Sequence, residues 1–436
     1  MPGHKRRKLG DEEVSKGSLL YRALDEINAY DVTELGATDD YLRPEGFFKD
    51  ALNELKKVYG SAASFYLVNG STSGIQAAVC ACAAKRPEAR KILVGADCHR
   101  SVYNIARLIG LEVVKLDPET NEIDGNDLAA VTNGIDRDDL IALTNRIDTK
   151  AYCAMVITSP DYDGVCKDVK KVAELAHGMG LPLIVDEAHG AHLWFSEKQR
   201  RLSALYNDAD IVIQSLHKTM PSPTQTALIH VMNEEYADEV REKIEMLISS
   251  SPSFPMLAAM ERAVARADEN RESFDKHLER VRKFMDRLSG SGSRIREYTF
   301  DSERDALRDK TRICLATDGV SGEAIESALL KEGVAVEMSA SDHVVLISTV
   351  MDDDEAFDRL QRAVERAAAE LDECGNISYN EQTNAVVRIG TVARKDIYVY
   401  PPGSPIVLKG QIIDEAAVRR IEEYIKAGKK VHGLAV

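Results

Sequence analysis

The feature that most constrains this chain is an alternation of short apolar segments with helix-length segments between about residues 63 and 231. Apolar stretches such as 154–158 and 210–214 end in polar or charged residues, and helical patterns lie between them. This alternation is typical of βαβ units, in which parallel strands share one sheet and helices cover its faces. The pattern therefore predicts an α/β fold built on a mostly parallel sheet.

The second half of the chain has a different pattern. Residues from about 234 to 288 read as helical and highly charged, and the segments from about 295 onward predict a smaller α+β unit. A chain of 436 residues is also too long for one ordinary hydrophobic core. We therefore predict an N-terminal arm and large domain over residues 1–290, and a small C-terminal α+β domain over residues 291–436.

The charge and the apolar patterning exclude several classes of protein. The net charge is −16 and the only basic cluster lies within residues 1–8, which argues against a nucleic-acid partner. No apolar run approaches the ~20 residues that cross a bilayer, and none follows the basic N-terminus as in a secretory signal. Seven cysteines with no C-x-x-C pair indicate reduced thiols. We therefore expect a cytoplasmic protein without a membrane partner.

Four groups of polar residues follow predicted strands, where open α/β sheets bind their ligands. The loop 69–74 carries three hydroxyls just before a helix, from Ser71, Thr72 and Ser73. Such a loop can bind an anion with backbone N–H groups, or it can simply cap the helix. His99 follows another strand, where its ring could stack on a flat cofactor or serve only a structural role.

The other two groups are a carboxylate and a lysine. Asp186 ends the apolar segment 181–185, and a buried carboxylate needs a partner such as a protonated pyridine nitrogen, a helix end or a basic side chain. Lys218 follows the next strand, and a desolvated lysine amine can form an imine. Its neighbours Ser215 and His217 can bind phosphate, which argues against an exposed loop lysine. Together the four groups predict a site for pyridoxal 5′-phosphate (PLP).

The same residues carry a resemblance to a known family. The chain resembles the Orn/Lys/Arg decarboxylase family in its short form, PLP-dependent enzymes with the aspartate aminotransferase fold (fold type I). The matching segments run over nearly the whole chain: Pro2–Lys5, Asp31–Leu35, Asp39–Asp40, Leu67–Gly74, Cys98–Ser101, Asp186–Gly190, Ser215–Thr219, Thr224–Gln225, Ser250–Ser253 and Tyr400–Gly403.

The resemblance implies a role for each matching position. Lys218 would hold the cofactor as an imine, Asp186 would pair with its ring nitrogen and His99 would stack on its ring. The remaining implied cofactor contacts are Ser71, Thr72, Ser73, Ser215 and His217 at the phosphate, Ala188 against the ring, and His189 near its phenolic oxygen. Ser250 or Ser251 would reach the phosphate or substrate of a partner subunit, because active sites in this family lie at a homodimer interface.

The implied activity is that of a lyase of amino-acid metabolism and polyamine biosynthesis. It would convert lysine, ornithine or arginine to its amine and CO2, with Lys218 or His217 returning a proton to Cα. Glu337 matches a family glutamate and would bind the distal cation of the substrate, although a solvated strand-edge charge is an equal interpretation. Segments 160–164 and 409–411 depart from the family pattern. The departures leave open elimination, cyclisation, transamination or oxidative deamination in specialised biosynthesis.

Three other interpretations are weaker. Residues 186–189 also spell the box of nucleic-acid helicases, but the Gly-x-x-x-x-Gly-Lys-Ser/Thr phosphate loop that those enzymes need is missing. His189 and His192 have no Cys or Glu at ligand spacing, so no metal site is predicted. A non-catalytic regulatory protein would have no need of the lysine and carboxylate pair.

Overall fold

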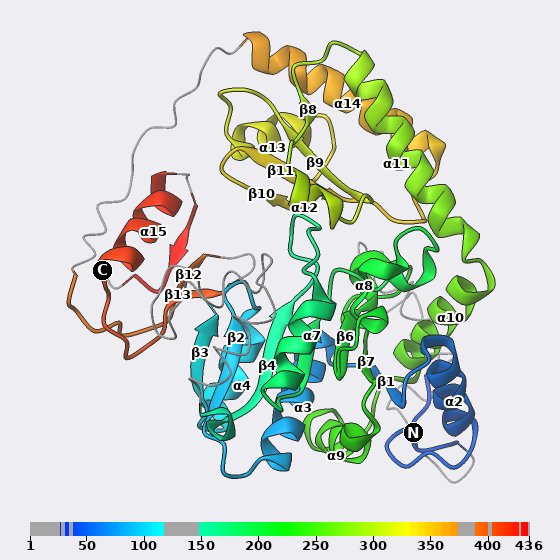
Figure 1. The fold of residues 1–436 in the computed structure, drawn as a ribbon. Helices are drawn as coiled ribbons and strands as arrows, with labels where there is room; N and C mark the ends of the chain where they lie inside the picture. Colours follow the sequence, from blue (N-terminus) through cyan, green and yellow to red (C-terminus); the bar gives the residue numbers. More distant parts are fainter. Residues whose placement is uncertain are drawn as a thin grey trace, which may run out of the picture.

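A computed structural model describes residues 27, 31–34, 38–116, 148–373, 389–399, 403–426 and 429–434. The predicted N-terminal motif at Pro2–Lys5 lies outside this part of the chain, as does most of the motif at Tyr400–Gly403. The described residues form three β-sheets with helices packed against them (Figure 1). The largest sheet lies in the first half of the chain.

The largest sheet has seven strands in the order β1-β7-β6-β5-β4-β2-β3. Only β7 runs antiparallel to its neighbours, so the predicted mostly parallel sheet is confirmed. Its strands are β1 (Ala63–Leu67), β2 (Lys91–Gly95), β3 (Glu112–Leu116), β4 (Tyr152–Thr158), β5 (Leu183–Asp186), β6 (Ile211–Ser215) and β7 (Ala227–Val231). The carboxyl ends of β1, β2, β4, β5 and β6 therefore meet at one edge.

The strands at the centre of this sheet are mostly apolar because helices cover both faces of the sheet. All seven residues of β4 are buried, as expected for a central parallel strand. Helix α3 (Gly70–Lys85) packs on β4, β6 and β7, while α7 (Val169–Gly178) packs on β5. Helices α4 (Arg100–Leu108) and α9 (Ala237–Leu247) pack against α3.

Close packing at Gly74 sets the position of α3. A Cβ atom at Gly74 would lie 2.6 Å from Leu67 Cδ1 and 3.0 Å from Ile213 Cγ2, so any other residue there would force these core side chains to move. The helix begins at Gly70, whereas the apolar pattern predicted a start at Ile75. The polar residues 71–73 continue the helical backbone without adding to the apolar face, and for this reason periodicity missed them.

Two long helices connect the large sheet to the rest of the chain (Figure 1). These are α10 (Phe254–Glu269) and α11 (Glu272–Gly290). On α11, Phe274 joins the core of the large sheet, while Val281 and Phe284 join a second core. The helical stretch predicted over 234–288 is interrupted at 248–253, just before the proline in the first turn of α10.

The second core belongs to an antiparallel sheet in the order β10-β11-β9-β8. Its strands are β8 (Arg296–Glu297), β9 (Arg312–Ala316), β10 (Met338–Ser339) and β11 (His343–Ile347), with helices α12 (Ser302–Ala306), α13 (Gly322–Lys331) and α14 (Asp354–Glu373). Strand β10 is short because it begins only at Met338, where pairing with β11 starts.

A third sheet, in the order β13-β12-β14, lies near the end of the chain with its own hydrophobic cluster. Its strands are β12 (Ile397–Val399), β13 (Pro405–Val407) and β14 (Val431–His432), next to helix α15 (Glu415–Lys426). Strands β12 and β13 have only three residues each. The predicted domain boundary at residue 290 stays a prediction.

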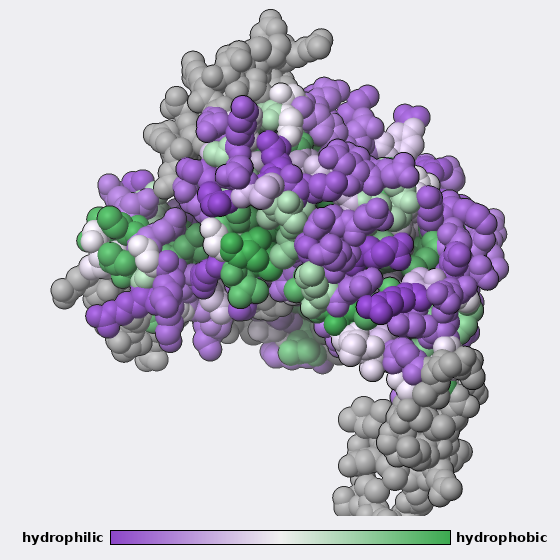
Figure 2. Space-filling model, turned by 90° about the horizontal axis from the view of Figure 1, so that it is seen from below, coloured by the Kyte–Doolittle hydropathy of each residue, from purple (hydrophilic) through white to green (hydrophobic). Residues whose placement is uncertain are grey.

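The outer surface is mostly polar. Seen from below, hydrophilic residues cover most of the molecule and hydrophobic groups reach the surface in places (Figure 2). Exposed large hydrophobic residues include Leu108, Met246 and Leu330. Within the described residues, no helix combines the length and the apolar character needed to span a bilayer.

A buried aspartate joins the large sheet to the second one. Asp309 precedes β9 and is fully buried, and its carboxylate accepts hydrogen bonds from Gln199 Nε2 at 3.1 Å and from the Thr311 backbone and hydroxyl. Its other oxygen lies 3.0 Å from His192 Nε2. Burial alone would raise the pKa of Asp309, but His192 and Arg312 lower it well below the usual range.

We expect Asp309→Asn to destabilise the protein by about 3 kcal/mol at neutral pH, because it leaves His192 without its carboxylate partner. A carboxylate with a lowered pKa stabilises the fold above its unfolded pKa of about 3.9, and this contribution is lost as the pH falls through the folded pKa. The difference between wild type and variant should therefore shrink below about pH 4. Urea titrations at several pH values measure it, with exposed Asp318→Asn as a control whose stability stays close to that of wild type.

Candidate active site

The structure places the predicted residues at one edge of the large sheet. Asp186 is the last residue of β5, and Lys218 lies in α8 (Leu216–Thr219), the single turn that follows β6. His99 precedes α4 just after β2, and Ser71 lies in the first turn of α3 after β1. Because these strands run parallel, their ends bring the four groups to the same edge.

Lys218 is largely buried among aromatic and charged side chains. Its Nζ atom lies 2.9 Å from His189 Nε2 and 5.9 Å from the centre of the Tyr162 ring. Burial lowers the pKa of Lys218, although the carboxylates of Asp186 and Glu337 oppose this shift. A lowered pKa makes the neutral amine more available, and the neutral amine is the form that attacks a carbonyl.

Asp186 is a buried carboxylate with few protein partners. It is 3% exposed, and it accepts the Ala188 backbone N–H at 3.1 Å. Burial raises its pKa to about 6, and the charge of Lys218 only partly offsets this effect. A cationic N–H group beside Asp186 would stabilise the carboxylate. The protonated ring nitrogen of PLP is such a group, so this residue fits the cofactor that the sequence predicted.

His189 has its proton position set by Arg312. The Arg312 guanidinium donates from Nη2 to His189 Nδ1 at 2.9 Å and to the His189 carbonyl at 3.2 Å. Because a guanidinium can only donate, Nδ1 is an acceptor and the neutral ring carries its proton on Nε2, toward Lys218. Burial and the charges of Arg312 and Lys218 lower the pKa of His189 well below its usual value. The ring therefore stays neutral.

His99 is held at the start of α4. Its Nδ1 atom accepts the Ser101 backbone N–H at 3.2 Å and lies 2.9 Å from the Ser101 hydroxyl. Burial, followed by the charges of Lys218 and Arg100, lowers the pKa of His99 to about 4. A neutral imidazole fixed in this way suits stacking against a flat ring.

The start of α3 fits a phosphate group. Asn69 precedes the helix without a side-chain cap, so backbone N–H groups of the first turn lack that partner. The Ser215 hydroxyl donates to the Ser71 hydroxyl at 2.9 Å, which joins this turn to the lysine segment. Ser73 is buried and donates to the Gly70 carbonyl, whereas Thr72 is exposed.

The remaining predicted residues lie in different surroundings. Ala188 is buried beside Asp186, and His217 Nδ1 lies 3.2 Å from the Thr226 carbonyl oxygen. Glu337 is exposed just before β10, and its backbone N–H donates to Val345 of the neighbouring strand. Ser250 and Ser251 are also exposed, in the segment between α9 and α10, and no described contact links them to Lys218. His192 faces Asp309 and Thr311, so it does not share a site with His189.

The sequence had assigned no role to Tyr162 or Arg312. The Tyr162 ring lies 4.6 Å from the His189 ring, centre to centre. Gly164 in the same loop has a φ of +86°, and a Cβ atom there would lie 2.4 Å from Arg312 Cγ. The unusual segment 160–164 was a visible signal for Tyr162. For Arg312 the only signal was an arginine inside an apolar strand, which needs a buried partner.

An open cleft beside the site is acidic on the side of the large sheet. Asp97, Asp161 and Asp163 line it after β2 and β4. Asp97 pairs with Lys167, and Asp163 lies 3.1 Å from His343 Nε2. Burial, with the nearby charge of Asp163, raises the pKa of Asp161 to about 6. Basic residues of α15 line the opposite side, among them Arg419 and Arg420.

We expect Asp186→Asn to stabilise the PLP-free protein at about pH 8. The folded pKa of Asp186, about 6, exceeds the unfolded value of about 3.9, so its contribution is most favourable at low pH and is lost as the pH rises through 6. Ionised Asp186 should therefore cost about 3 kcal/mol at pH 8. The variant should melt higher than wild type there, with a smaller difference at about pH 5, and it should bind PLP more weakly.

Thermal unfolding of the PLP-free proteins at both pH values, together with PLP titrations, measures these effects. Asp210→Asn is the matched control, because Asp210 is also buried but accepts hydrogen bonds from the Leu183 backbone and the Asn233 side chain. That variant should be less stable than wild type at pH 8. A loss of stability in Asp186→Asn equal to that of the control would show that Asp186 already has sufficient protein partners.

Two curated proteins are similar to this chain. The uncharacterized protein YaaO of Bacillus subtilis is 29% identical over 99% of this chain and 92% of its own length. The arginine decarboxylase of the same organism is 27% identical over 99% of this chain and 91% of its own. Both likenesses span nearly the whole length of each protein.

Solved structures share the fold. The lysine decarboxylase LdcF of Francisella novicida superposes with a TM-score of 0.73, at 15% identity, over 98% of this chain and 77% of its own. Serine palmitoyltransferase from S. paucimobilis with bound PLP gives a TM-score of 0.55, at 14% identity, over 76% of this chain and 78% of its own. The predicted fold, that of fold type I PLP enzymes, is thereby confirmed.

The family is shown by the first two thirds of the chain. Residues 1–301 match the major domain of Orn/Lys/Arg decarboxylases. This match covers the seven-stranded sheet, α10 and α11, and it includes the segments that hold Asp186 and Lys218. The chain belongs to the Orn/Lys/Arg decarboxylase family.

Proposed function

We propose that this protein is a PLP-dependent decarboxylase of a basic amino acid, with Lys218 as the residue that binds the cofactor covalently. One observation carries the proposal: the buried Lys218 amine lies in the field of two carboxylates, Asp186 and Glu337. Asp186 comes from the large sheet and Glu337 from the second one. The first suits the cofactor ring and the second suits the distal cation of a substrate.

The residues at the sheet edge would each hold one part of the cofactor. PLP supplies an electron sink for the electron pair that remains when CO2 leaves. Asp186 would keep the ring nitrogen protonated, which preserves that sink. The first turn of α3, with Ser71, Ser73 and Ser215, would bind the phosphate. His99 would lie against the ring, with Ala188 on the loop after Asp186.

Lys218 and His189 are placed to handle protons. The lowered pKa of Lys218 makes its amine a readier carrier of a proton than an exposed lysine would be. His189 carries its proton on Nε2, 2.9 Å from that amine, and can donate it to the amine or to the phenolic oxygen of the cofactor. Lys218 would then return a proton to the substrate Cα, with His217 as the second candidate.

The charges around the site favour a cationic substrate. Glu337, whose charge acts on the Lys218 amine, offers a carboxylate to a side-chain ammonium or guanidinium group. The arginine decarboxylase relative and the lysine decarboxylase structure act on such substrates. Lysine, ornithine and arginine remain the three candidates, and their amines are polyamines or polyamine precursors.

We also propose a cytoplasmic homodimer with active sites at the interface. Ser250 and Ser251 are exposed between α9 and α10, so they are accessible to a partner subunit. Their predicted contact with the phosphate or substrate would then be made across the interface.

We expect the PLP-loaded protein to release CO2 and the matching amine from one of lysine, ornithine or arginine. Incubation with each amino acid and mass spectrometry of the products tests this reaction. Lys218→Ala should lower the rate at least about 10³-fold, because it removes both the covalent link and a proton carrier. PLP bound through Lys218 without any amine product would overturn the decarboxylase proposal and favour another amino-acid chemistry.

We expect Glu337→Gln to lower kcat/KM for the basic substrate by about tenfold, or about 1.4 kcal/mol, mainly through KM. The amide keeps the shape but loses the charge that would bind the distal cation. Glu332→Gln is the control, since that carboxylate lies in the same segment and pairs with Arg366. An unchanged KM in Glu337→Gln would remove this residue from the substrate site.

A further inference from the structure

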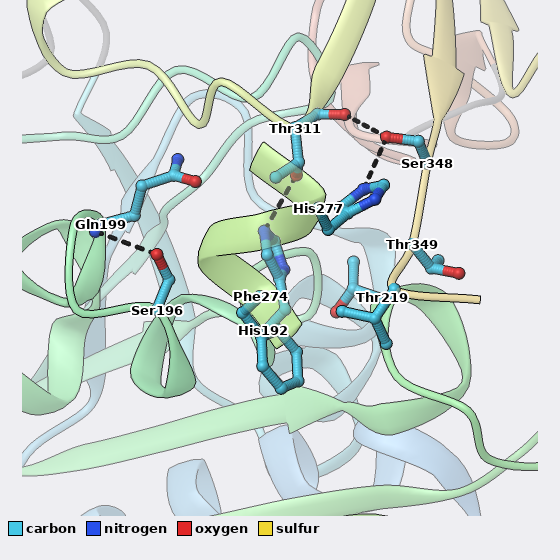
Figure 3. A pocket seen from close by; sticks show the side chains of 10 residues that line it. His192, Ser196, Gln199, Thr219, Phe274, His277, Thr311, Ser348 and Thr349 are labelled. Carbon is cyan, nitrogen blue, oxygen red and sulfur yellow. Dashed lines mark hydrogen bonds between the residues drawn. The ribbon is translucent and has the colours of Figure 1, made fainter. Parts of the chain in front are cut away.

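A second cavity, much smaller than the cleft, lies next to the lysine turn (Figure 3). Thr219, the residue after Lys218, lines it together with His192 and Gln199 from the segment after β5. His277 on α11, and Thr311 and Ser348 at the ends of β9 and β11, complete it. The space inside holds about one water molecule and is too small for an amino acid.

Four buried polar atoms in this cavity have no hydrogen-bond partner among the described residues: His192 Nδ1, Gln199 Oε1, Thr219 Oγ1 and His277 Nδ1. Their side chains are at most 6% exposed. Buried polar groups almost always have partners in folded proteins. Four such atoms around one small space therefore indicate a bound molecule.

Two of the four atoms are acceptors. The Ser348 hydroxyl donates its only proton to the Thr311 carbonyl at 2.8 Å, so His277 Nε2 must donate to Ser348 at 3.0 Å. Burial lowers the pKa of His277 to about 4, so the ring is neutral and its Nδ1 carries a lone pair. Gln199 donates through Nε2 to Asp309, which leaves its Oε1 oxygen as the second acceptor.

The Thr219 side chain supplies a donor. The Thr219 hydroxyl has a proton to give. The Thr311 hydroxyl donates its proton to the Asp309 carboxylate. The hydrogen bond between Thr311 Oγ1 and His192 Nε2 must therefore be donated by His192, so this nitrogen carries a proton. His192 Nδ1, on the other side of the ring, is the fourth atom.

We propose that this cavity is a binding site for one water molecule, which links the lysine turn to α11. The water accepts from the Thr219 hydroxyl, and it donates to His277 Nδ1 and Gln199 Oε1. An anion would leave both of these acceptors unpaired. The described residues also hold no cluster of three or more His, Cys, Asp or Glu side chains suited to a metal ion.

The position of the site gives this water a structural role. Thr219 directly follows Lys218, whereas His277 lies on α11 between Phe274 of the first core and Val281 of the second. The water therefore connects the turn that carries the lysine to the helix that leads into the second sheet. This link does not depend on which reaction the enzyme performs.

A crystal structure of the wild-type holoenzyme, at a resolution that shows ordered waters, is the direct test. We expect a density peak about 2.7–3.2 Å from Thr219 Oγ1 and from at least two of the other three atoms. Absence of a peak, or a peak with the shorter distances of a metal ion, would overturn the proposal. So would side chains that turn to pair with one another.

Variants test the water in solution. Thr219→Val removes one partner at nearly constant volume, and we expect it to lower the Tm by about 1–3 °C with and without PLP. Thr219→Ser keeps the hydroxyl and should melt near wild type. Thr317→Val is the matched control, because the Thr317 hydroxyl is also buried without a described partner but lies outside this cavity. Equal melting of the two valine variants would contradict the proposal.

Discussion

Burial of the Lys218 amine at the carboxyl edge of the large sheet sets the requirements for the groups around it. A buried ammonium is unfavourable unless carboxylates compensate it, and here Asp186 and Glu337 only partly do so. The amine is therefore biased toward its neutral form. A neutral amine in turn needs a neighbour that does not add positive charge, and His189 meets this condition because burial and Arg312 keep its ring neutral.

Arg312 makes the second sheet part of this arrangement. It begins β9, yet its guanidinium donates to the ring and the carbonyl of His189 in the large-sheet unit. The buried Asp309 lies 3.9 Å from Arg312 Nε and accepts from Gln199 of the same unit. The orientation of the His189 ring therefore depends on how the two sheets pack. A shift between the sheets would change whether the N–H proton of His189 faces Lys218.

The sequence predicted the groups that directly follow strands and missed those that reach the site from elsewhere. Asp186 ends one apolar strand and Lys218 lies in the turn just after another, and a parallel sheet brings such positions together whatever its details. Arg312 contacts His189 across more than a hundred positions, and no local pattern encodes that pairing. The prediction of short strands fails for the same reason, because β10 forms only where Met338 pairs with Val345. The roles assigned to Ser250 and Ser251 concern a second subunit, which one chain cannot test.

The site also explains why the protein without cofactor should be the less stable form. Asp186 is ionised in a buried place near neutral pH. Gln225, beside the turn at Gly70, has a left-handed φ of +79° that strains a residue with a side chain. These features oppose folding in the free protein. A ligand that binds only the folded state offsets them by mass action, and a cationic ring nitrogen near Asp186 would remove the larger of the two costs. Cofactor affinity and fold stability are thus set by the same few buried groups.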